Sequence, residues 1–127
     1  MISMALSDLL QFPHFYAMIT AVIFLTISII LVTVHKPKKW FSIHIFCSST
    51  GTLLTIVGII LLMGLNLTLL HGVLGLIAII FLIGELVGGF VARKLKNKKI
   101  RSIHLWISRI IYLVVLIAVI LGISYFI

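Results

Sequence analysis

Apolar residues fill four long continuous runs of this chain, and polar residues gather in the short segments between them. Each run has the length of about 20 residues that a helix needs to cross the hydrocarbon core of a bilayer. Within the runs, polar and apolar residues do not alternate as they would in the strands of a membrane β-barrel. The pattern predicts an all-α membrane protein, a four-transmembrane-helix bundle. The predicted helices are roughly 14–34, 43–65, 69–92 and 103–126.

The composition agrees with a protein that has lipid as its solvent. Hydrophobic residues make up 63% of the 127 residues and charged residues only 9%, which would leave a soluble domain of this size with a mostly apolar surface. We expect residues 1–127 to form one transmembrane domain. The first run lacks a basic start and is too long for a signal-peptide core, so we expect it to remain as a helix. The single Cys47 excludes an internal disulfide and is expected to pack as a small apolar residue.

Basic residues in two of the loops predict the orientation. The net charge of +8 would fit a nucleic-acid-binding protein, but the charges follow membrane topology instead. In a serpentine of four helices, the loops after the first and third helices share one side. The positive-inside rule makes this side cytoplasmic and puts both termini outside, in a multi-pass protein of the cytoplasmic membrane. Lipid headgroups alone would account for these charges, and attraction of an anionic substrate is a second role. The basic loop residues are Lys36, Lys38, Lys39, Arg93, Lys94, Lys96, Lys98, Lys99 and Arg101.

Four of the five histidines stand about one turn inside the N-terminal end of a predicted helix. Because the helices alternate in direction, the histidines form two pairs at two depths. His14 and His71 share the outer leaflet, and His44 and His104 share the inner leaflet. Polar side chains at membrane depth are costly and indicate a function by default. Two imidazoles on facing helices can hold haem iron from opposite sides, which leaves no open coordination position and suits electron transfer.

Small residues continue along the helix faces that carry the histidines. Steps of three and four residues from His44, His71 and His104 lead mostly to glycine, serine, threonine and alanine, which lie on one face of each helix. These stripes would leave room for a flat macrocycle, and they would equally permit close helix packing or a homodimer. Zinc or copper would need further close ligands, and carboxylates are scarce. His35 is expected at the surface, near a substrate entrance.

Three segments are similar to those of one family of membrane proteins. Residues 70–90, LHGVLGLIAIIFLIGELVGGF, look like a helix that begins Leu-His, continues with Leu-Gly and ends in Gly-Phe. His14 to Met18 is similar to a His-Pro-x-x-Met helix start, and His104 to Gly122 resembles a last helix that begins with histidine. The chain thus resembles the four core helices of the eukaryotic-type cytochrome b561 family, the transmembrane dihaem ascorbate and ferric reductases. The resemblance covers about residues 13–124.

The resemblance implies a transmembrane oxidoreductase with two haem b groups per chain. In the family the first and third core histidines bind the non-cytoplasmic haem, and the second and fourth bind the cytoplasmic haem. Electrons would pass from a cytoplasmic, ascorbate-like reductant to an outer acceptor such as a ferric chelate. Family members gather basic residues at the cytoplasmic haem to bind ascorbate. The residues in a similar place here are Lys38, Lys39, Lys98, Lys99 and Arg101.

The chain departs from this family at several positions. The family usually has two further helices, Phe15 stands where it has proline, and Glu85 stands where it has glutamine. Glu85 is expected to tune the inner haem, either ionised or protonated. Arg109 lies at a similar depth by the helix rise. Three arrangements are open for Arg109: pairing with Glu85, contact with a haem propionate, or extension to the lipid headgroups.

Other functions are open at this stage. A quinol-linked membrane cytochrome b subunit would use the same haems with a lipid-soluble donor. A metal-ion transporter would line its path with the histidines and bind no haem. Half of a haem-modifying enzyme and a structural membrane protein with incidental histidines are further alternatives.

Overall fold

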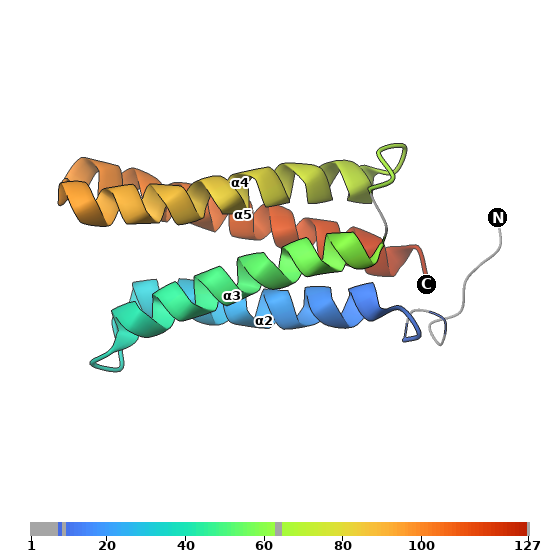
Figure 1. Ribbon diagram of the computed structural model, residues 1–127, viewed down its shortest axis with the longest axis horizontal. Coiled ribbons are helices and arrows are strands. Elements are labelled where there is room, and N and C mark those ends of the chain that lie inside the picture. The colour runs from blue at the N-terminus through green and yellow to red at the C-terminus, as the bar shows by residue number, and fades with distance from the viewer. Residues whose placement is uncertain (1–7, 9, 63–64, 127) are drawn as a thin grey trace.

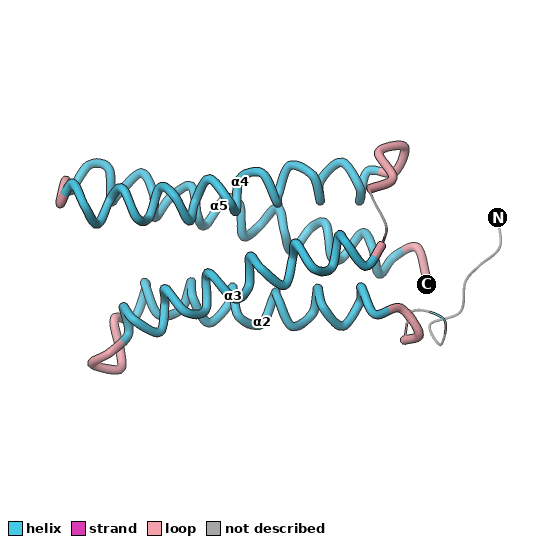
Figure 2. The backbone as a smooth tube through the Cα atoms, viewed as in Figure 1, coloured by secondary structure: helices cyan, strands magenta, loops and turns pink. Residues whose placement is uncertain are grey.

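The computed structural model describes residues 8, 10–62 and 65–126, and within them the only extended regular elements are four helices. All four helices are long and apolar enough to cross a membrane, which confirms the predicted fold. They alternate in direction, so that the α2–α3 and α4–α5 loops lie at one end and the start of α2 and the end of α5 at the other (Figures 1 and 2). We term these the basic end and the terminal end. The helices are α2 (Pro13–Val34), α3 (Trp40–Leu61), α4 (Leu70–Leu95) and α5 (Lys98–Ser124).

The helices extend further at the basic end than the hydropathy pattern predicts. The helix α3 begins at Trp40 rather than 43, and α5 begins at Lys98 rather than 103. In α5 the added turn contains Lys98, Lys99 and Arg101, whose long charged side chains favour helix and can continue it beyond the apolar core of a bilayer. The start of α5 is fixed by Asn97, whose side chain accepts hydrogen bonds from the backbone N–H groups of Lys99 and Ile100.

The other boundaries differ by smaller amounts. Pro13, at the first helical position, begins α2 one residue before the predicted start. The helix α4 covers Leu70–Leu95 rather than 69–92, and α5 ends at Ser124 rather than 126. The helix α3 ends at Leu61 rather than 65. Residues 63–64, in the predicted final turn of that helix, lie outside the described residues.

The helices pack as two hairpins, α2–α3 and α4–α5, with most contacts inside each hairpin. Gly51 shows how closely the first hairpin is packed. A Cβ atom added there would lie 2.8 Å from side-chain atoms of Leu25 and 3.2 Å from the carbonyl oxygen of Ala21. A larger residue here would require the Leu25 side chain and the backbone at Ala21 to move, and glycine avoids this, as is common where membrane helices approach closely. The large apolar side chains left exposed on the outside are suited to lipid.

The two hairpins meet near the middle of their length, in a region that we term the waist. Here buried apolar side chains join α2 to α4 and α5. Beside them, the hydroxyl groups of Thr26 in α2 and Tyr112 in α5 lie 2.6 Å apart. From the waist the hairpins diverge toward the basic end (Figure 1). The apolar residues of the waist are Leu25, Ala78, Leu82, Ile111 and Val115.

Candidate functional site

Two histidines at the terminal end are held through Nδ1 by the other helix of their own hairpin. Nδ1 of His14 lies 2.8 Å from the carbonyl oxygen of Gly58. Nδ1 of His71 lies 2.6 Å from the carbonyl oxygen of Ala118. A carbonyl oxygen only accepts hydrogen bonds, so Nδ1 carries the proton in both rings. The lone pair of Nε2 is therefore available for a metal ion.

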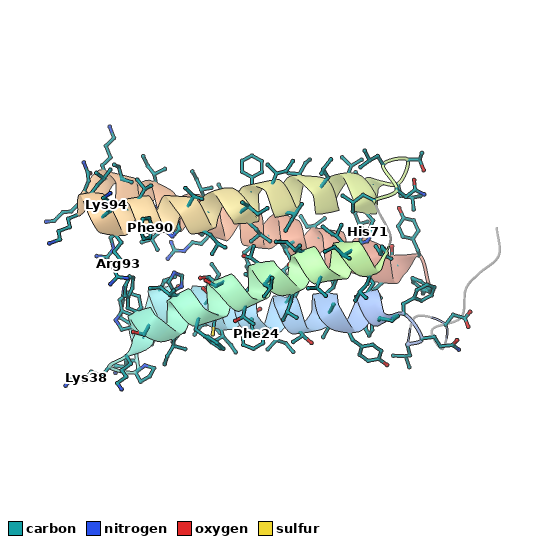
Figure 3. The ribbon with its side chains drawn as sticks, in the orientation of Figure 1. Phe24, Lys38, His71, Phe90, Arg93 and Lys94 are labelled. Atoms are coloured by element: carbon teal, nitrogen blue, oxygen red, sulfur yellow. The ribbon has the colours of Figure 1, made fainter. Side chains whose placement is uncertain are left out.

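The same two rings face each other across the hairpins. The ring centres of His14 and His71 are 6.2 Å apart and the ring planes are inclined by 83°. Two imidazoles bound to opposite sides of one metal ion have ring centres about 6 Å apart, because each metal–nitrogen bond is about 2 Å long. Figure 3 labels His71 between the two hairpins. The spacing of this pair thus suits a metal ion held between the hairpins.

At the basic end, His44 is held by α2 in a similar way. Its Nδ1 lies 2.7 Å from the hydroxyl oxygen of Ser28 and 3.3 Å from the carbonyl oxygen of the same residue. With a carbonyl among its neighbours, Nδ1 is the donor. The partner again comes from the same hairpin, and it is electrically neutral.

His104 has a different partner. Its Nδ1 lies 2.7 Å from Oε2 of Glu85 in α4, and the two side chains are only 15% and 16% exposed. The ring N–H is not aimed along this contact, and this buried nitrogen makes no aligned hydrogen bond in the described part of the chain. The two side chains are thus in close contact without an aligned hydrogen bond. Ser108 donates a hydrogen bond from its hydroxyl group to the same carboxylate oxygen.

His44 and His104 line one cavity between the hairpins. Its volume is about 760 Å³, within the range of about 300–1,000 Å³ that is typical of sites for small molecules and cofactors. The deep part reaches apolar residues of the waist, and the mouth at the basic end is cationic. Figure 3 shows Arg93 reaching from α4 into the gap at this end. The cavity suits a largely apolar molecule with an anionic edge. The cationic lining residues are Arg93, Lys96, Lys98 and Arg101.

The number of protein side chains that could bind one metal ion decides which kind of metal group fits. Among the described residues, no group of three or more His, Cys, Asp or Glu side chains is placed to hold a metal ion. A structural zinc site needs four protein ligands, so neither histidine pair completes one. A haem brings its own in-plane nitrogens and needs only axial ligands from the protein. Two histidines from facing hairpins fit that requirement.

The predicted substrate-binding residues divide into two sets in the structure. Lys98 and Arg101 line the cavity, together with Arg93 and Lys96, which were not among the predicted substrate-binding residues. Arg93 follows the lining residue Gly89 by four residues, so helical spacing on the histidine face would have identified it. The remaining predicted residues are exposed at the same end but are not part of the cavity lining. These are Lys38, Lys39 and Lys99.

The predicted alternatives for Arg109 are reduced by the structure. The predicted ion pair between Glu85 and Arg109 does not form. In the described part of the chain, Glu85 pairs with His104 instead. The guanidinium carbon of Arg109 instead lies 5.2 Å from the ring centre of Trp106, one turn earlier in α5, which is a cation–π contact. Arg109 does not line the cavity.

His35 and Cys47 are placed as the sequence predicts. His35 is exposed, lines the cavity at the basic end and lies with its ring centre 4.6 Å from that of Trp40. The side chain of Cys47 is buried, and the thiol is free. Neither His35 nor Cys47 belongs to one of the two histidine pairs.

Glycines on the neighbouring helix leave room for two of the histidine rings. A Cβ atom at Gly122 would lie 2.7 Å from Cε1 of His71, and one at Gly89 would lie 3.1 Å from Cε1 of His104. Each ring thus lies against the backbone of the facing helix in its own hairpin. The space for a bound group at the basic end comes from the divergence of the hairpins, and the glycines keep the histidines close to the helices that orient them.

The chain matches no protein-family model, no curated protein and no solved structure. The site therefore has to be interpreted from its own geometry. Its four histidines present Nε2 at two levels, which lie roughly 20 Å apart by the helix rise between His104 and Ala118, the partner of His71. Such an arrangement can hold two metal groups on opposite sides of an apolar waist.

Proposed function

We propose that this chain is a transmembrane oxidoreductase that carries electrons across the membrane by means of two haem b groups. His14 and His71 would hold one haem at the terminal end, and His44 and His104 the other at the basic end. The observation that carries the proposal is the environment of Nδ1, which in all four rings lies against an oxygen atom of the neighbouring helix. Histidines that bind metals are oriented in this way by a second partner. The resemblance to the cytochrome b561 family supports the same assignment.

When bound, haem supplies a one-electron iron couple at each end of the bundle. Each haem would be held by two histidines, His14 with His71 and His44 with His104, and a haem held in this way would supply electron transfer and not the binding of oxygen. The waist, with Leu25, Leu82 and Val115 buried at its centre, keeps water out of the region between the two sites. Exclusion of water and fixed ligands both limit the reorganisation that accompanies a change of charge.

The basic residues at one end of the bundle indicate the direction in which electrons would move. With the protein in the cytoplasmic membrane, the basic end faces the cytoplasm by the positive-inside rule. Arg93, Lys98 and Arg101 at the cavity mouth would attract an anionic, ascorbate-like reductant by electrostatic steering. The electrons would leave at the terminal end to an outer acceptor such as a ferric chelate.

The test is a dithionite-reduced minus oxidised visible spectrum of the full chain purified in detergent, with haem measured per chain. We expect a sharp b-type α band, two haems per chain, and reduction by ascorbate. Absence of haem in protein from a haem-producing host would overturn the proposal, and metal flux in proteoliposomes would then test the transporter alternative. Reduction by quinols but not by ascorbate would replace the donor and keep the haems.

A further inference from the structure

The four histidines occupy similar positions in the fold but do not have similar partners. His14 and His71 lie against backbone carbonyl groups, and His44 lies against Ser28. Among the described residues only His104 of this set has a carboxylate as its partner, with Glu85 Oε2 at 2.7 Å from Nδ1. The site at the basic end therefore has a carboxyl group in its immediate surroundings, which the site at the terminal end lacks.

Glu85 is an unusual residue for this place. The chain contains two acidic residues in all, and Glu85 is the one within a candidate membrane span. A carboxylate at membrane depth is costly and is retained where it has a specific role. Here its side chain is 16% exposed and contacts both His104 and the hydroxyl group of Ser108. These contacts fix the carboxylate on the Nδ1 side of the ring, away from Nε2.

We propose that Glu85 is a positioning residue that lowers the reduction potential of the basic-end site through His104. This inference rests on the proposed haem ligation. A carboxylate in contact with Nδ1 makes the imidazole a stronger electron donor to a metal at Nε2, here through its proximity and not through an aligned hydrogen bond. Stronger donation favours the oxidised iron, and the surroundings of the ligands that hold a haem are a recognised control of its potential. The bound pair of sites would then be biased toward electron flow from the basic end to the terminal end.

The cations at the cavity mouth act in the opposite direction, because positive charge favours the reduced iron. Arg93, Lys96, Lys98 and Arg101 are exposed, and charges in water are screened over about 8 Å at physiological salt. Glu85 is largely buried and in direct contact with the ring, where the lower dielectric makes each charge more effective. The carboxylate therefore has the larger influence on His104.

The experiment is a potentiometric titration of the full chain in lipid nanodiscs, followed at the α band, for the wild type and for Glu85→Gln. The two sites are assigned with His14→Ala, which removes the terminal-end pair. For Glu85→Gln we expect the reduced-to-oxidised ratio of the basic-end site, at a fixed ambient potential, to rise at least tenfold. For a one-electron couple this is a shift of 59 mV. The terminal-end site should not change. Ser28→Ala is the matched control, because it removes only a neutral hydroxyl group from His44 and should shift the potential far less.

Ser108→Ala tests the same inference with the opposite sign. Loss of the Ser108 hydroxyl group leaves the carboxylate freer to interact with His104, so the basic-end potential should fall. Ser108→Ala also tests the role of Glu85 if the Glu85→Gln variant loses its haem. Unchanged potentials in Glu85→Gln with both haems bound, or a Ser108→Ala potential that does not fall, would overturn the role of Glu85. A wild type without haem would instead overturn the proposed function itself.

Discussion

The rings of His14 and His71 lie with their centres 6.2 Å apart and their planes inclined by 83°, although the two residues belong to different hairpins. Each ring is held from behind by its own hairpin, through Gly58 and Ala118. The distance between the rings is therefore set by how closely the hairpins approach. That approach is fixed at the waist, where apolar packing and the Thr26–Tyr112 contact join the hairpins.

His14→Ala should remove one bound haem and leave the other. His44 and His104 line a separate cavity, so the basic-end site keeps both of its ligands. We expect the haem content per chain of the purified variant to halve in a pyridine haemochrome assay. His35→Ala, which changes an exposed histidine without a partner ring across the hairpins, should keep the full content. Loss of both haems in His14→Ala would show that the two sites are not independent.

Gly122→Ala should disturb the terminal-end site through His71. The added Cβ would lie 2.7 Å from Cε1 of that ring, too close for any real contact, so the ring or the helix must move. Overpacking of this kind costs about 1–3 kcal/mol. We expect a lower midpoint of thermal unfolding in detergent and preferential loss of the terminal-end haem.

Gly84→Ala is the control for the glycine substitution. Nothing lies within 4 Å of a Cβ atom at Gly84, and glycine inside a helix is less favourable than alanine by about 0.5–1 kcal/mol. This variant should unfold at an unchanged or higher temperature and keep both haems. Equal haem loss in Gly122→Ala and Gly84→Ala would show that the contact of Gly122 with the His71 ring is not what holds the terminal-end site in place.

Much of this architecture follows from the sequence because the bilayer restricts the choices. Backbone groups in lipid must be paired within a helix or a closed barrel, so continuous apolar runs give the number and type of elements. Alternation of helix direction then places His14 with His71 and His44 with His104. The ring contact of the first pair and the shared cavity of the second agree with that placement.

The partners of the charged residues could not be obtained in this way. Helix rise gives depth but not the angle at which neighbouring helices meet, so Glu85 and Arg109 were expected as one possible pair. In the structure α4 and α5 turn Glu85 toward His104, and Arg109 toward the ring of Trp106. Helix ends at the basic end were also missed, because hydropathy does not register a cap such as Asn97.

Tyr112→Phe should weaken the contact between the hairpins. The Thr26 hydroxyl group donates to the carbonyl oxygen of Val22, so the Tyr112 hydroxyl group is the donor in the bond to Thr26. Hydrogen bonds between membrane helices contribute about 0.6 kcal/mol on average and up to about 1.7. We expect a loss of stability in this range in reversible unfolding in mixed micelles.

A double-mutant cycle with Thr26→Val isolates this bond from other effects of the two substitutions. The coupling between Tyr112→Phe and Thr26→Val should account for most of the loss. Thr33→Val is the control, since the exposed Thr33 hydroxyl group donates to the carbonyl oxygen of Ile29 in its own helix. Additive effects of Tyr112→Phe and Thr26→Val would show that the hydroxyl pair does not join the hairpins.

Neutralising the cavity mouth should slow reduction by an anionic donor. In the double variant Lys98→Gln and Arg101→Gln, two cations that line the cavity are lost. Electrostatic steering changes association rates by about tenfold or more at low salt. We expect the second-order rate constant for reduction by ascorbate, measured by stopped flow, to fall about tenfold at low ionic strength. The difference should shrink as salt is added, because the Debye length falls to about 3 Å at 1 M.

The matched control removes two charges at the same end that do not line the cavity, Lys38→Gln with Lys39→Gln. This pair should slow ascorbate less than the cavity-mouth pair does, although the net charge changes equally. An uncharged reductant should reduce both variants at similar rates. Equal effects of the two pairs on ascorbate would mean that the donor senses the overall charge of the basic end. A larger effect of Lys38 and Lys39 would put the donor on the α2–α3 loop, outside the cavity that His44 and His104 share.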